Sequence, residues 1–185
     1  MKLRNLFTFG TLILSLAAGN ALAQDDKAKK QAEIRKVTQT SLQKFYKAKP
    51  ELKGEVEKAP GYAVFTTYGL SFLLGGAGGK GFAHDNKAKK DTFMHLAQAS
   101  AGAQVGIAES ETLFIFPTQK SFDDFVNKGW EASGGGSVQA GAGGKSAGTA
   151  SGGTTDARYY TLTKNGLQVG IAVAGTKIWK DKELN

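Results

Sequence analysis

The run GGAGGKG at Gly75–Gly81 is the first pattern whose residue types could do chemistry. Glycine-rich backbone can cradle a phosphate through its N–H groups, and a lysine can neutralise the charge. A P-loop reads G-x-x-x-x-G-K-[ST] between a strand and a helix, but here Gly81 follows Lys80. In the later run GAGGKS, Gln139 stands at the first glycine position. Neither run matches a P-loop, and the glycine run could still be either a phosphate contact or closely packed sheet backbone.

Other catalytic patterns are weak. Gly76, Gly78 and Gly81 spell G-x-G-x-x-G, but no amphipathic helix follows, as a dinucleotide site requires. His84 and His95 lack metal-ligand spacing, and the chain has no cysteine. A Ser-His-Asp triad assembles only in space and leaves no spacing to test, and no G-x-S-x-G elbow is present. The sequence predicts a protein without enzyme activity, metal or cofactor. A pocket with a serine or aspartate beside either histidine would indicate an enzyme instead.

Basic residues crowd the segment after residue 26. Its apolar side chains (Ile34, Val37, Leu42, Phe45 and Tyr46) recur at helical spacing, and the predicted helix covers about 26–48. Pro50 and Gly54 are typical of a helix end. One interpretation is an amphipathic helix on a membrane surface, with part of the apolar stripe inserted. The other, which we favour, is a helix that packs its stripe on its own domain while its lysines are solvated.

The first 23 residues are typical of a secretory signal peptide. A basic start, an apolar run and Ala21-Leu22-Ala23 precede the predicted new N-terminus at Gln24. Residues 24–185 are long enough for one domain. We expect an exported protein of the periplasm or cell envelope, or one that is secreted. The net charge of +8 favours anionic partners such as lipid headgroups or glycans, and export argues against nucleic acid.

From Gly61 onward the pattern changes to short apolar runs typical of strands, and this β-rich body covers about 60–181. Asn165-Gly166 is a hairpin signal, and HDNKAKKD at 84–91 is a polar turn or loop. A second helix is expected near 121–131, with Ser121 and Asp124 as its capping box. We expect at least the first part of the Gly-rich segment 133–155 to be ordered. The fold class is α+β: a largely antiparallel sheet or flattened barrel with two helices.

Five blocks in this order resemble the SYLF domain. They are KAPGYAVF, GLSFLLGGAGGKGFA, ASAGAQVGIAESETLFIF, SFDDFVNKGWEASGGGSVQAGAGGKSA and YYTLTKNGLQVGIAVAGTKI. The resemblance runs from about Ile34 to Lys180. It departs from the family where KKDTFMHLAQ replaces a Trp and a Pro, and where Gln168 replaces an aromatic residue.

The resemblance implies binding of anionic lipids, including phosphoinositides, at a membrane surface. It also implies that GGAGGKG lies between two strands of the family's core pattern, so we expect its glycines to serve close backbone packing first, with Lys80 as a secondary contact to a lipid phosphate. Host phosphoinositides or actin become partners only if the protein is secreted. The alternative is a cell-envelope protein that binds a protein or glycan, for example through an edge strand. The residues expected to contact lipid are Lys27, Lys29, Lys30, Arg35, Lys36, Lys44, Lys47, Lys80, Lys87, Lys89 and Lys90.

Overall fold

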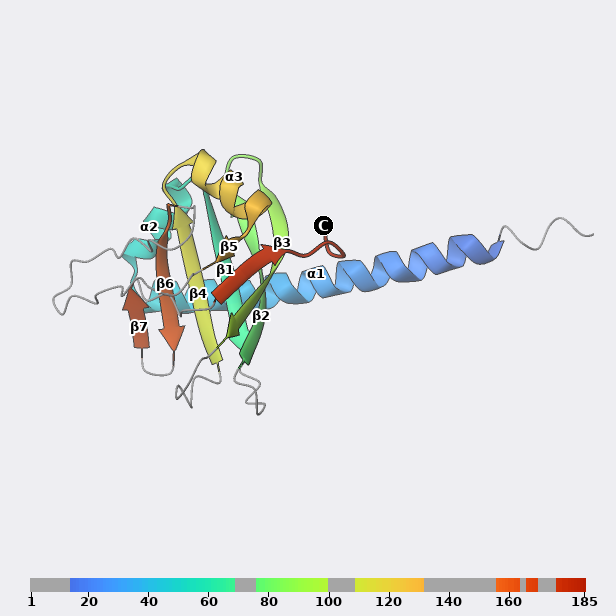
Figure 1. Cartoon of the computed structure of the whole chain (residues 1–185), viewed down its shortest axis with the longest axis horizontal. Helices are drawn as coiled ribbons and strands as arrows, with labels where there is room; N and C mark the ends of the chain where they lie inside the picture. The colour runs from blue at the N-terminus through green and yellow to red at the C-terminus, as the bar shows by residue number, and fades with distance from the viewer. Residues whose placement is uncertain (1–13, 69–75, 100–108, 132–155, 164–165, 170–175) are drawn as a thin grey trace, which may run out of the picture.

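The computed structural model describes residues 14–68, 76–99, 109–131, 156–163, 166–169 and 176–185. The described ranges leave out LSFLL at 70–74 and most of AQVGIAE at 103–109, two of the runs whose pattern predicts strands, and the Gly-rich segment 133–155. The predicted α+β class is confirmed (Figure 1). Three helices accompany one eight-stranded sheet in which every described strand pair is antiparallel.

The sheet has the strand order β5-β8-β3-β2-β1-β4-β6-β7 and curls into a half-barrel (Figure 1). Its strands are β1 (Gly61–Tyr68), β2 (Gly76–Asp85), β3 (Lys90–Ala99), β4 (Glu109–Phe116), β5 (Trp130–Glu131), β6 (Arg158–Thr163), β7 (Gly166–Val169) and β8 (Thr176–Lys180). Side chains alternate between its two faces, as the period of two requires. Ala63 and Phe65 of β1 enter the core of the concave face, and Val64 between them enters the core under the helices.

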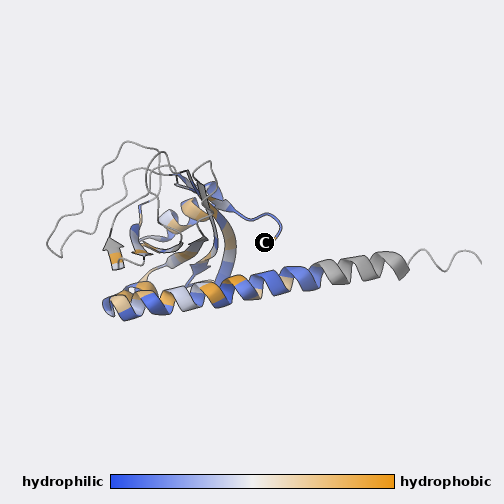
Figure 2. Cartoon of the chain, turned by 90° about the horizontal axis from the view of Figure 1, so that it is seen from below, coloured by the Kyte–Doolittle hydropathy of each residue, from blue (hydrophilic) through white to orange (hydrophobic). Residues whose placement is uncertain are grey.

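Helix α1 (Leu14–Ala48) crosses the convex face of the sheet and extends past it at its N-terminal end (Figures 1 and 2). It begins well before residue 26, because the residues from Leu14 to Gln24 include no proline and are mostly good helix formers. The predicted start was therefore wrong, whereas the end at Ala48 agrees with the prediction. No helix among the described residues is long and apolar enough to cross a membrane.

The apolar stripe of α1 packs on the sheet. Ile34 joins Phe82, Phe93 and Leu184 in one cluster. Leu42 and Phe45 lie in a second cluster, which also contains β1, β4 and β6 residues. The interpretation of the stripe as a membrane-inserted surface is therefore wrong in this conformation, because burial against strands has already removed the stripe from water.

Two shorter helices complete the fold. Helix α2 (Glu51–Lys58) follows α1 directly, with Pro50 at its N-cap, and Gly54 lies inside it rather than ending a helix. Helix α3 (Gln119–Lys128) covers the concave side at one end through Phe122, Phe125 and Val126. Its predicted capping box was placed one turn too late. Thr118 is the N-cap, and its side chain accepts the Ser121 N–H while the Ser121 hydroxyl accepts the Thr118 N–H.

Candidate functional site

The glycine run is sheet backbone. Residues 76–81 belong to β2, which pairs with β1 on one side and β3 on the other. A Cβ on Gly81 would lie 2.0 Å from the Val64 carbonyl oxygen, and one on Gly79 would lie 2.6 Å from that of Thr66. Because both neighbouring strands take up the backbone groups of β2, these groups cannot cradle a phosphate. The expectation of close packing is confirmed for Gly79 and Gly81 but not for Gly78, whose added Cβ would meet nothing within 4 Å. Lys80 lies exposed on the convex face.

Several of the predicted lysines lie on the outward side of α1. Lys29, Lys36 and Lys47 are exposed and fall within about 20° of one another around the helix axis at 100° per residue, opposite the buried Thr38. Lys30 is exposed on the flank of the same helix. Within the described ranges, none of these four side chains is in an ion pair with an acidic residue. We call Lys29, Lys30, Lys36 and Lys47 the helix lysines.

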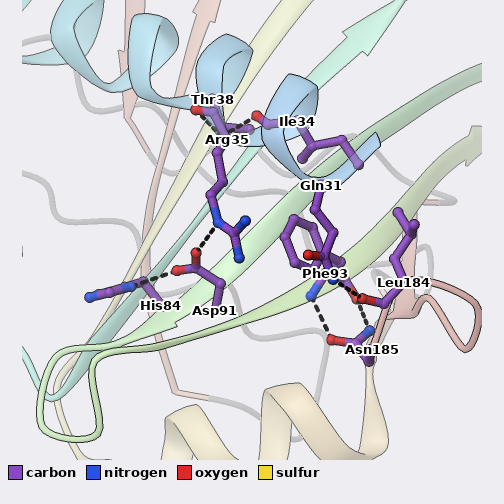
Figure 3. A network of polar contacts seen from close by, with 9 residues as sticks. All are labelled: Gln31, Ile34, Arg35, Thr38, His84, Asp91, Phe93, Leu184 and Asn185. Carbon is purple, nitrogen blue, oxygen red and sulfur yellow. Dashed lines mark hydrogen bonds and ion pairs between the residues drawn. The ribbon is translucent and has the colours of Figure 1, made fainter. Parts of the chain in front are cut away.

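The other three basic residues predicted on this helix contact other parts of the molecule. Arg35 Nε donates to Asp91 Oδ2 of β3 at 2.6 Å (Figure 3). Lys44 pairs with Glu111 of β4, and Lys27 Nζ donates to the carbonyl oxygen of Asn185 at 2.8 Å. Each of these three charged groups therefore has a partner within the molecule.

Asp91 is the centre of the network in Figure 3. Its Oδ1 lies 2.7 Å from His84 Nδ1, while its Oδ2 accepts from Arg35. Burial is the largest single influence on the pKa of Asp91 and raises it. The hydrogen bonds from His84 and Arg35, with their charges, outweigh burial and leave the pKa below its usual 3.8. The network ties α1 to the β2–β3 hairpin.

Lys87, Lys89 and Lys90 lie in and beside the turn of that hairpin and are exposed. Asp85 Oδ1 accepts the N–H groups of Lys87 and Ala88, at 2.8 and 2.7 Å, and this fixes the turn. Along β2, these lysines are separated from Lys80 by the part of the strand that α1 covers. The structure therefore does not bring all the predicted lipid contacts into one cluster.

Two histidine–aspartate pairs are present. Besides His84–Asp91, His95 Nε2 lies 2.8 Å from Asp181 Oδ2. The second oxygen of each carboxylate has a structural partner: Arg35 in one case, and the N–H groups of Glu183 and Leu184 in the other. Neither histidine lines the small cavity described next. No group of three or more His, Cys, Asp and Glu among the described residues could hold a metal ion.

The concave side of the half-barrel is filled by side chains. Its cavity measures about 10 Å³, close to the space that one water molecule needs. Its walls are Leu96, Gln98, Thr112, Phe114, Trp130, Tyr159, Thr161 and Thr176. A lipid headgroup does not fit into a space of this size.

One exposed residue of the convex face was not predicted from the sequence. This residue is Trp179 of β8, whose side chain is 41% exposed. Among the described residues, it is the one large hydrophobic residue that is exposed. The sequence TKIWK could have indicated this, because side chains alternate between the two faces of a strand. With Ile178 buried, its neighbour Trp179 lies on the opposite face.

Comparison of the sequence with known proteins identifies a family to which the chain is similar. Residues 97–185 match the family model Ysc84, described as Las17-binding protein actin regulator. Beta cell expansion factor A of Aeromonas veronii is 31% identical over 151 residues, which cover 82% of this chain and 57% of that protein. LAS seventeen-binding protein 3 of Saccharomyces cerevisiae is 32% identical over 138 residues, covering 70% of this chain and 30% of that protein.

A second yeast relative, Protein YSC84, is 30% identical over 139 residues, with the same 70% and 30% shares. This chain thus spans little more than half the length of the Aeromonas relative and less than a third of the yeast relatives. The similarity to the Aeromonas protein extends well beyond the segment that the family model matches. The chain is a member of the SYLF (Ysc84) family, as its sequence blocks indicated.

Proposed function

We propose that this protein attaches, without enzyme activity, to an anionic lipid surface through the helix lysines. The observation that carries the proposal is the division of the basic residues of α1. Arg35 and Lys44 form ion pairs with residues of the sheet. In contrast, Lys29, Lys36 and Lys47 are exposed on the side of the helix that faces away from the sheet. A row of exposed ammonium groups on a rigid helix is suited to a negatively charged surface.

The strength expected for such attachment is modest and depends on salt. Each lysine near an anionic surface contributes on the order of 1 kcal/mol. The attraction falls off over about 10 Å at 0.1 M ionic strength. Because the apolar stripe is buried, α1 contributes charge and not insertion. Attachment is therefore reversible. We propose that it takes place beyond the inner membrane, in the periplasm or cell envelope or outside the cell.

The yeast relatives favour a second candidate. LAS seventeen-binding protein 3 is named for a protein partner, and the family model is described as an actin regulator. A protein partner in place of lipid is therefore the alternative for this chain. The two candidates differ in what the helix lysines contact, so the same variants test both.

The test compares two triple variants with equal charge loss. Lys29→Gln, Lys36→Gln and Lys47→Gln together remove the outward row. Lys120→Gln, Lys128→Gln and Lys182→Gln remove the same charge from exposed positions elsewhere. We expect only the first variant to lose binding to phosphatidylglycerol vesicles, by roughly a hundredfold if each lysine contributes about 1 kcal/mol. Equal binding by both variants contradicts the proposal.

A further inference from the structure

Part of the convex face lies beyond α1. In the strand register, Trp179 of β8 pairs with His95 of β3, and His95 pairs with Lys80 of β2, so the three side chains share one face. In the next row of that face, Lys177 pairs with Ala97. Gly78 of β2 lies beside Ala97. We call this group the sheet-face strip; its members are Gly78, Lys80, His95, Ala97, Lys177 and Trp179.

The strip is open to solvent. Lys80 and Gly78 are exposed, and a Cβ added to Gly78 would meet nothing within 4 Å. The Lys177 side chain is 62% exposed, and its contact with the equally exposed Glu131 is long, at 3.6 Å. An exposed pair at this distance contributes little, so both groups remain in water. Among the residues that the structure describes, nothing covers this strip of sheet surface, which has a tryptophan at its outer end.

Trp179 is held in place rather than loosely attached. Its ring stacks on the His95 ring, with centroids 5.5 Å apart and planes at 28°. His95 is fixed in turn by Asp181, which is buried and accepts two backbone N–H groups of the C-terminal turn. A pre-ordered aromatic ring loses little conformational freedom on binding.

The strip also joins the basic helix. Lys80 pairs with Thr66 of β1, and the Thr66 hydroxyl lies 3.1 Å from that of Ser41 on α1. Lys30 and Val37 lie on the same flank of the helix as Ser41, by the helical repeat. The surface from α1 to β8 therefore carries positive charge at Lys30, Lys80 and Lys177 and an indole at its end.

We propose that the sheet-face strip is a second contact with the anionic bilayer, in which the Trp179 indole enters the headgroup layer. This inference rests on the proposed function and adds the orientation of the protein on the membrane. Tryptophan suits that depth, because its ring is apolar on one side and its N–H finds polar partners. The lysines match the surface charge, which a largely apolar protein partner would not require. Trp179 thus supplies the apolar contact that the buried stripe of α1 does not.

The test uses tryptophan fluorescence of the purified protein with phosphatidylglycerol vesicles. The chain has two tryptophans, and Trp130 is buried in the core. Trp179→Phe therefore leaves only the buried ring to report. We expect the wild-type emission to shift to the blue and to be quenched by lipids brominated near the headgroup. Trp179→Phe should show neither change and should still sediment with the vesicles.

A second variant measures how much Trp179 contributes to the affinity of the protein for the vesicles. Trp179→Gln should weaken vesicle binding roughly tenfold, mainly in the fraction that resists salt. An unchanged wild-type emission in protein that sediments with vesicles overturns the strip contact and leaves the proposed function standing. If nothing sediments, both fail. A blue shift on concentrating the protein without lipid, with a doubled mass, overturns the contact in favour of a second copy of the chain.

Discussion

The guanidinium of Arg35 and the carboxylate of Asp91 lie 2.6 Å apart and join α1 to β3. Arg35 also lies over the Phe93 ring, 4.8 Å from its centroid. The residue next to it, Lys36, points to solvent. One turn of helix thus carries a basic residue that holds the fold and a basic residue available to a partner.

This division predicts opposite outcomes for two neighbouring substitutions that remove the same charge. Arg35→Gln should lower the free energy of unfolding by about 1 kcal/mol, because Asp91 loses its charged partner and Phe93 loses the guanidinium over its ring. Lys36→Gln should leave stability within about 0.5 kcal/mol and weaken binding to anionic vesicles. Urea unfolding and vesicle sedimentation on both variants check this. Equal effects of the two substitutions in both assays would show that Arg35 and Lys36 do not differ in role.

The lowered pKa of Asp91 predicts a pH dependence with a definite sign. A carboxyl whose folded-state pKa lies below its usual 3.8 contributes stability above that value and loses it as the pH falls through the lowered pKa. Asp91→Asn should therefore be less stable than wild type at pH 7. The difference should shrink as the pH falls below 3.8 and through the lowered pKa, because the wild-type carboxyl then becomes protonated. Urea unfolding of both proteins across this range measures it, and a constant difference would be the contrary result.

Two glycines of β2 predict different costs for the same substitution. Gly81→Ala should destabilise by about 1–3 kcal/mol, because its Cβ would meet the Val64 carbonyl and the Phe65 backbone. Gly78→Ala, three residues away on the same strand, has open space and should change stability by less than about 0.5 kcal/mol. Thermal melts followed by circular dichroism compare them. A melting temperature lowered equally by both would mean that β2 is not packed as described.

The N-cap of α3 supplies a further prediction. Thr118→Ala removes the side chain that accepts the Ser121 N–H and should cost about 1 kcal/mol. Asp124 instead pairs with Lys120 and Lys128 on the helix surface, and Asp124→Asn should cost less stability than Thr118→Ala. Unfolding free energies of the two variants distinguish the caps, and a larger loss at Asp124 would restore the capping box expected from the sequence.

Much of the fold follows from local pattern. Alternation along GYAVFTT predicts the strand that became β1, and the spacing of Ile34, Leu42 and Phe45 predicts the buried face of α1. The hairpin signal at Asn165-Gly166 agrees with the antiparallel pairing of β6 and β7, in which Thr163 faces Gly166. Each of these depends on neighbours in the chain, which the sequence shows directly.

The division of the basic residues could not be predicted in the same way. Arg35 and Lys44 look like the other cations of α1, and their partners Asp91 and Glu111 come from strands far along the chain. Which carboxylate reaches which cation depends on strand order and on where α1 crosses the sheet. The misplaced cap of α3 has a more local cause, since Thr118 and Ser121 offer the same chemistry one turn apart.

The central claim is that the helix lysines hold the protein on an anionic surface, and vesicle sedimentation tests it most directly. The purified protein is mixed with phosphatidylglycerol or phosphatidylcholine vesicles at about 0.05 M and about 0.5 M salt. We predict binding to the anionic vesicles alone, strongly reduced at the higher salt. Equal binding to both lipids, or binding to neither, would contradict the account.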